Sequence, residues 1–213
     1  MLLFGHTGIT LGVAALLANA LPGGYFSRNT GNEVIESSSP SSQVPQAVSG
    51  NPGHRTSWFV SLGARMDIRL LLIGSLLPDI IDKPVGLFFF REAISNGRIF
   101  CHTLLFLFLT TMAGVYLYRR LGKTHLFAVS FGVLTHLIFD QMWRNPHTLF
   151  WPFLGLIFDR EDAAEWLINI FNALFTEPET YLPELAGAII LGWFVVTLML
   201  RRKVWHFLRS GQI

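Results

Sequence analysis

The stretch LPDIIDKP, residues 77–84, decides how this chain is interpreted. It closes an apolar run that begins near residue 68 and places two carboxylates, Asp79 and Asp82, within hydrophobic sequence. A carboxylate in such surroundings is costly unless it pairs, binds a cation or meets water. Side chains three residues apart share one side of a helix, where two negative charges repel each other. Because only Lys83 offers a nearby positive charge, a metal ion bound by the two aspartates is the simplest explanation.

The composition indicates a membrane protein. Of the 213 residues, 51% are hydrophobic and only 14% are charged, and the mean hydropathy is +0.45. Soluble domains have about a quarter charged residues, so we expect a single, all-α integral membrane domain that covers residues 1–213. The net charge of +2 is too small to indicate a nucleic-acid partner. The single cysteine, Cys101, excludes an internal disulfide.

The apolar segments predict about five transmembrane helices, near residues 1–21, 68–81, 99–118, 126–142 and 185–200. The first segment has an alternative reading as a cleaved signal peptide, because Ala18-Asn19-Ala20 resembles a cleavage site. No basic residues precede its apolar run, however, and this favours a retained helix. Pro78 is expected to bend or end the second helix near the two aspartates.

Two further segments have distinct compositions. Residues 22–57 are rich in Ser, Pro and Gly and predict a flexible loop, because they contain too few apolar side chains to bury a core. Residues 161–175 repeat large apolar side chains at helical spacing, which predicts an amphipathic helix lying at the membrane interface.

The basic residues predict the orientation of the chain in a cell (inner or plasma) membrane. Eleven of the 16 Lys and Arg residues fall on one side of the five-helix topology. The positive-inside rule puts that side, with the C-terminus, in the cytoplasm and the N-terminus outside. These residues are Arg28, Arg55, Arg65, Arg69, Arg119, Arg120, Lys123, Arg201, Arg202, Lys203 and Arg209.

In this topology six side chains that could bind a metal fall at one depth, near the non-cytoplasmic surface. They come from four separate helices and are His6, Asp79, Asp82, His102, His136 and Asp140. His136 and Asp140 share a helix face at i, i+4, where a structural hydrogen bond is the alternative. A single histidine near a helix end, such as His6 or His102, is often only an interfacial residue. His147 lies on the same side but in a loop, so it is a weaker candidate.

Imidazole and carboxylate ligands together suit a divalent transition metal. We expect zinc, with manganese or iron as alternatives, and one or two ions with an open position for water. Such ions ionise water and hold an anionic ester. Arg98 and Arg144 each lie four residues from a candidate ligand, so continuous helices would bring both guanidinium groups to a bound phosphate. Pairing with the aspartates is the alternative. Asp79 or Asp82 would act as the general base if it does not bind the ion.

The order of these motifs resembles the membrane-bound, metal-dependent hydrolases, a family also described as LexA-binding, inner-membrane-associated hydrolases. The matching pieces are GHTG at 5–8, LPDIID at 77–82, GRIFCHT at 97–103 and THLIFD at 135–140, and WPF at 151–153 also fits. The resemblance covers about residues 1–155 and implies a metal-dependent hydrolase. In that family a histidine commonly stands where this chain has Gly97, which argues against a second ion.

We therefore expect a membrane-embedded hydrolase acting on a phosphate ester or a lipid-like anionic substrate at the non-cytoplasmic face. The protein would lie within membrane lipid, and lipid would also be its expected binding partner. Two alternatives stay open. A metal or proton transporter would also contain buried His and Asp residues. A non-catalytic scaffold would use its ion only to tie helices together.

Overall fold

The computed structural model describes residues 2–20, 66–89, 97–156, 158 and 163–211. Within these ranges the chain forms helices joined by turns and contains no strand, which confirms the all-α prediction. The predicted loop at 22–57 and the start of the amphipathic segment at 161–162 lie outside the described residues.

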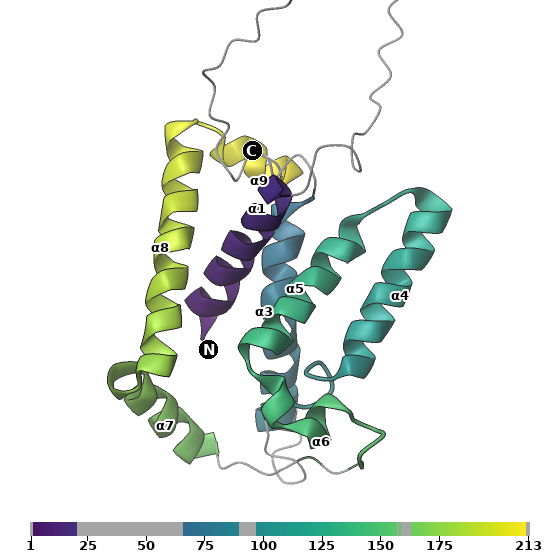
Figure 1. The fold of residues 1–213 in the computed structure, drawn as a ribbon, viewed down its shortest axis with the longest axis vertical. Helices are drawn as coiled ribbons and strands as arrows, with labels where there is room; N and C mark the ends of the chain where they lie inside the picture. Colours follow the sequence, from purple (N-terminus) through teal and green to yellow (C-terminus); the bar gives the residue numbers. More distant parts are fainter. Residues whose placement is uncertain (1, 21–65, 90–96, 157, 159–162, 212–213) are drawn as a thin grey trace, which may run out of the picture.

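Five long helices lie alongside one another (Figure 1). They are α1 (Thr10–Ala20), which continues the short π-helix η1 (Gly5–Ile9), α3 (Ile68–Pro84), α4 (Leu104–Leu121), α5 (His125–Phe139) and α8 (Pro178–Leu200). The smaller elements are η2 (Val85–Phe89), η3 (Met142–Arg144), α6 (Pro146–Leu149), α7 (Ala163–Thr176) and α9 (Val204–Ser210). In Figure 1, α6 lies at the lower end of the bundle, and α9 and the C-terminus lie at the upper end.

Two of the described helices, α4 and α8, are long and apolar enough to cross a membrane, rather than the five that the sequence predicts. Both expose large apolar side chains: Phe108 of α4 is 58% exposed and Ile189 of α8 is 63% exposed. Surfaces of this kind are costly in water and favourable in lipid. Residues 5–18 and α5 are also apolar but shorter.

Helix boundaries differ from the prediction at two places that matter for the site. Helix α3 continues through Pro78 to Pro84, so both aspartates are helical. Helix α4 begins at Leu104 rather than at residue 99, because Thr103 caps it by accepting the Phe106 N–H at 3.1 Å. Residues 97–103 therefore form turns, and Arg98 and His102 do not share a helix face.

Glycines allow two pairs of helical segments to approach closely. A Cβ atom at Gly74 of α3 would collide with the Val129 backbone of α5, and one at Gly132 of α5 would collide with the α3 backbone. Gly8 of η1 and Gly187 of α8 form a second contact of this kind. Small residues at helix crossings are typical of membrane proteins, because close backbone packing replaces the hydrophobic effect there.

Apolar and polar side chains are buried at opposite ends of the bundle. The end beside α9 contains an apolar cluster that includes Leu11, Ile68, Leu71, Phe194 and Phe207. The buried Asp82 and His136 lie toward the other end of α3 and α5. The segment predicted at 161–175 forms α7, whose Phe171 and Phe175 are exposed. Its location at a membrane interface stays a prediction.

The close contact between α3 and α5 predicts that Gly74→Ala destabilises the protein. The added methyl group would force the backbones apart, a strain that costs roughly 1–3 kcal/mol. Thermal unfolding of the purified protein in detergent measures the change. Gly192→Ala is the matched control, since no described atom lies within 4 Å of a Cβ at that position of α8. Equal melting temperatures for the two variants would contradict the close contact.

Candidate metal centre

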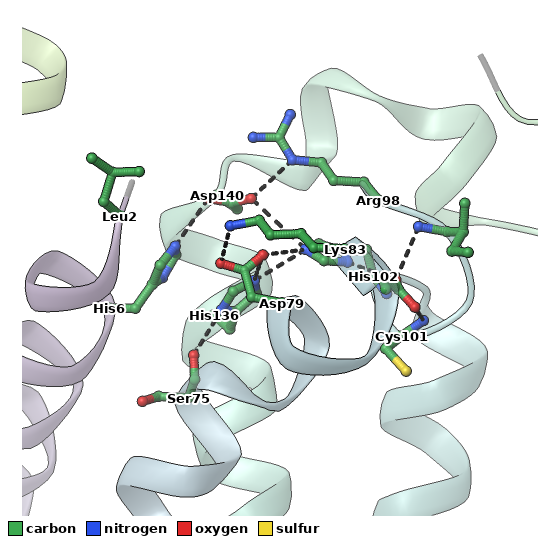
Figure 2. Close-up of polar contacts among 12 residues, drawn as sticks. Leu2, His6, Ser75, Asp79, Lys83, Arg98, Cys101, His102, His136 and Asp140 are labelled. Atoms are coloured by element: carbon green, nitrogen blue, oxygen red, sulfur yellow. Dashed lines mark hydrogen bonds and ion pairs between the residues drawn. The ribbon is translucent and has the colours of Figure 1, made fainter. Parts of the chain in front are cut away.

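A cluster of histidines and aspartates lies where four segments meet: η1, the lower end of α3, the turn before α4 and the end of α5 (Figure 2). His6, His102 and His136 are completely buried, and the Asp140 side chain is 4% exposed. These residues are far apart in the sequence, so the packing of the helices brings them together.

Asp82 orients the His102 ring. Its carboxylate is completely buried and accepts backbone N–H groups from Ile99 (2.9 Å), Cys101 (2.9 Å) and His102 (3.1 Å). The His102 Nδ1–H also donates to Asp82 Oδ2 at 2.8 Å, because a carboxylate can only accept. When His102 is neutral, this contact keeps the hydrogen on Nδ1 and leaves the lone pair of Nε2 facing the cluster.

The same logic applies to His136. Its Nδ1–H donates to the Ser75 carbonyl oxygen of α3 at 2.7 Å, so its Nε2 also carries a lone pair. The two Nε2 atoms of His102 and His136 lie only 3.1 Å apart. Two acceptors cannot form a hydrogen bond with each other. The arrangement therefore requires a positive species near both nitrogens, either a proton or a metal ion.

Two carboxylates extend this cluster. Asp140 accepts from Arg98 Nε at 3.0 Å, and its Oδ1 lies 3.1 Å from His6 Nε2. Asp79 Oδ1 lies 3.5 Å from His102 Nε2 and 3.9 Å from His136 Nε2. Its other oxygen accepts from Lys83 Nζ at 2.6 Å. Each carboxylate thus turns one oxygen toward the histidines and contacts a basic side chain with the other.

The ligand atoms form two overlapping groups in which all atoms lie within 4.8 Å of one another. One group is His6, His136 and Asp140, and the other is Asp79, His102 and His136. His136 belongs to both. The set contains three imidazoles and two carboxylates, a combination that fits a borderline transition metal better than calcium or magnesium.

The local charges favour the ionised forms of two groups outside the helices. Burial alone raises the pKa of Asp140, but hydrogen bonding from His6 and the charge of Arg98 hold the pKa of this carboxyl well below its usual range. Burial lowers the pKa of His102, and hydrogen bonds to Asp79 and Asp82 overcome that effect and raise it. Without a metal ion, a proton at His102 would partly supply the missing positive charge.

Five of the six predicted ligands belong to these two groups. Asp82 belongs to neither group, because it lies behind His102 and accepts its Nδ1–H. For Arg98, the sequence left open an anion-binding role or an ion pair with Asp79 or Asp82. In the structure Arg98 forms an ion pair, but its partner is Asp140. Arg144 is exposed, because α5 ends at Phe139 and Gln141 adopts a φ of 51°. His147 is exposed as well. The roles of all these residues stay predictions.

Sequence reasoning missed two parts of the site. The Ser75 carbonyl oxygen, which fixes the His136 tautomer, left no signal because every residue has such a group. Glu184 is a buried acid of α8 that binds the start of the first helix. The sequence does contain a signal for Glu184, because this charged residue stands directly before the apolar run of residues 185–200.

A family model described as YdjM inner membrane protein matches residues 1–204, which include every element of the site. Comparison with curated proteins and with solved structures gave no significant match. The family description agrees with the expected inner-membrane location and leaves metal binding and hydrolysis as predictions.

Proposed function

The chain belongs to the YdjM inner membrane protein family, and from this premise we propose that its buried cluster is a catalytic metal centre. The ligands are His6, His102, His136, Asp79 and Asp140, and zinc is the metal that we expect. The observation that carries the proposal is the pair of Nε2 lone pairs 3.1 Å apart, surrounded by carboxylate oxygens. Such a set of acceptors is unfavourable unless a cation neutralises it.

A single ion explains the contacts better than two. Both candidate groups need His136, and its Nδ1 is committed to the Ser75 carbonyl, so only Nε2 is left as a ligand. One imidazole nitrogen serves one metal ion. Asp82 is then an orienting residue rather than a ligand, because backbone N–H groups and His102 Nδ1–H occupy its oxygens. Carboxylates in this position hold the ring and make it a better ligand.

The metal proposal predicts that His136→Ala and Asp140→Ala each lower the bound transition metal well below the stoichiometric amount. Elemental analysis of protein purified in detergent measures the content. His206→Ala is the control, because this exposed histidine lies in α9 at the opposite end of the bundle. Full metal content in both site variants would show that their contact only packs helices.

The reaction that we propose is hydrolysis of a phosphate ester or a similar anionic group. A bound divalent ion would supply Lewis acidity and make water acidic enough to ionise near neutral pH. Asp79 is the better candidate for accepting the proton of that water if it does not bind the ion, because its side chain is 14% exposed whereas that of Asp82 is completely buried. Arg98, whose side chain is 36% exposed, borders the cluster and would bind the anionic group.

A transporter would need polar side chains along the whole thickness of the bundle. The apolar cluster of α1, α3, α8 and α9 instead occupies the end opposite the histidines. This one-sided distribution supports a site that opens to one surface, and it supports hydrolysis over transport.

We further propose that all five long helices span the membrane, with the site at the non-cytoplasmic face. Their side-by-side arrangement supports this proposal, since the long helices that follow one another along the chain run in alternating directions (Figure 1). The basic residues support the orientation. Arg119, Arg120, Lys123 and the Arg201-Arg202-Lys203 cluster all lie at the end opposite the site.

This orientation predicts which cysteines react in intact cells. In a Cys101→Ala background, His147→Cys should react with a membrane-impermeant thiol reagent, and Lys123→Cys should be protected until the cells are lysed. Both positions are exposed, so burial does not explain a difference between them. The reverse pattern would put the site in the cytoplasm.

The hydrolase proposal predicts that Arg98→Lys keeps its metal but hydrolyses an anionic ester more slowly. Losing one charge-assisted contact costs roughly 1.5–3 kcal/mol, which is on the order of ten- to a hundredfold in rate. A screen of phosphate monoesters, diesters and phospholipids, with metal content measured on the same preparations, identifies the substrate. Arg119→Lys, at the other end of α4, is the control. A wild-type rate for Arg98→Lys would remove this residue from substrate binding, and inactivity of the metal-loaded protein on every ester would contradict hydrolysis of this substrate class.

A further inference from the structure

We propose that Glu184 is a positioning residue that fixes His6 at the metal centre, an inference that rests on the proposed metal-binding function. Glu184 belongs to α8, which supplies no ligand atom to either candidate group. Glu184 is nevertheless buried, with only 7% of its surface exposed, and the long apolar run of α8 follows it. A carboxylate buried in such surroundings needs strong partners.

Among the described residues, the partners of Glu184 are backbone N–H groups at the start of the first helical segment. Its Oε2 accepts from the Phe4 N–H at 3.0 Å, and its Oε1 accepts from the Leu2 N–H. The first N–H groups of a helix have no partner within the helix, and the helix dipole makes this end positive. Glu184 therefore caps the first helix from a neighbouring one. With both oxygens bound in this way, it is not itself a metal ligand.

This contact reaches His6 through one helical turn. The Leu2 carbonyl oxygen accepts the His6 N–H at 3.3 Å, so fixing Leu2 also fixes the height of His6 along the helix. The imidazole then extends from η1 toward α5, where Nε2 lies 3.1 Å from Asp140 Oδ1 and the ring stacks on that of His136 with centroids 4.1 Å apart.

A close backbone contact makes the connection between the two helices stiff. Gly187 lies three residues after Glu184 and therefore on the same side of α8. A Cβ on Gly187 would collide with the Phe4 carbonyl oxygen, and a Cβ on Gly8 would collide with Gly187. The glycines set how close η1 and α8 approach, and the Glu184 carboxylate sets where the first helix begins.

The first helix has a second tie, to α5. Thr10 and Thr135 share a buried hydrogen bond of 2.9 Å one turn beyond His6. That contact holds the helix after His6, whereas Glu184 holds the helix before His6. Without Glu184 the N–H groups of the first turn would lose their acceptor. We expect this turn to fray and His6 to move, while the other four proposed ligands keep their places.

Cobalt(II) binding to the full-length protein in detergent tests this inference, since cobalt replaces zinc and its visible spectrum reports the ligand set. Glu184→Gln keeps the shape but loses the charge and one acceptor. We expect it to weaken cobalt binding roughly tenfold, as loss of an outer partner of a ligand does, and to shift the spectrum toward that of His6→Ala. Glu179→Gln, in the exposed first turn of the same helix, should leave both unchanged.

The double variant gives the decisive comparison. If Glu184 acts through His6, then Glu184→Gln added to His6→Ala should change cobalt affinity by less than twofold, because the ligand that it positions is already gone. A full additional loss in the double variant overturns the role of Glu184 while leaving the metal centre intact. Failure of the wild-type protein to bind cobalt overturns the metal centre and the role of Glu184 together. If Glu184→Gln does not fold, Glu184→Asp, which keeps both acceptor oxygens on a shorter side chain, is compared in the same way.

Discussion

The 3.1 Å approach of His102 Nε2 and His136 Nε2 is the constraint on which the rest of this structure depends. Each ring donates its other nitrogen's hydrogen to a buried acceptor, Asp82 for one and the Ser75 carbonyl for the other. Both lone pairs are thereby turned inward, toward the carboxylates. An arrangement of acceptors alone is unfavourable in a buried site, because nothing offsets the cost of removing them from water. A cation at this point would make the same arrangement favourable, and this is the physical basis of the proposed metal centre.

The glycines of α3 and α5 make this approach possible. The Ser75 carbonyl lies beside Gly74. Here the backbones of α3 and α5 are so close that a Cβ atom at Gly74 or at Gly132 would collide with the other helix. Close packing of this kind lets a backbone carbonyl of one helix act as the hydrogen-bond acceptor for a histidine of the other. The fold and the site are therefore not independent. The same small residues that let the two helices pack closely also bring the Ser75 carbonyl, which fixes the tautomer of His136, within reach of that ring.

The two aspartates of the LPDIIDKP stretch show how one motif can serve two purposes. They are three residues apart on α3, yet Asp79 faces His102 and His136, and Asp82 faces the turn before α4. Asp82 accepts the N–H groups of that turn and so determines where His102 lies. Asp79 contacts Lys83 with one oxygen and the histidines with the other. Asp79, a proposed ligand, and Asp82, which orients the proposed ligand His102, thus lie one turn apart on a single helix.

The sequence by itself determined the helical class, the membrane character and which residues could meet. Hydropathy and helical spacing are local properties, so the apolar segments, the helix α7 and the meeting of the histidines and aspartates at one end of the bundle could be predicted from them. The tertiary structure decided the division of labour between Asp79 and Asp82, the pairing of Arg98 with Asp140 and the end of α5 before Arg144. It also decided the capping of the first helix by Glu184. Each of these depends on which way a side chain points and on which backbone groups a turn leaves without partners. Those directions follow from how the helices pack, and sequence spacing alone does not specify them.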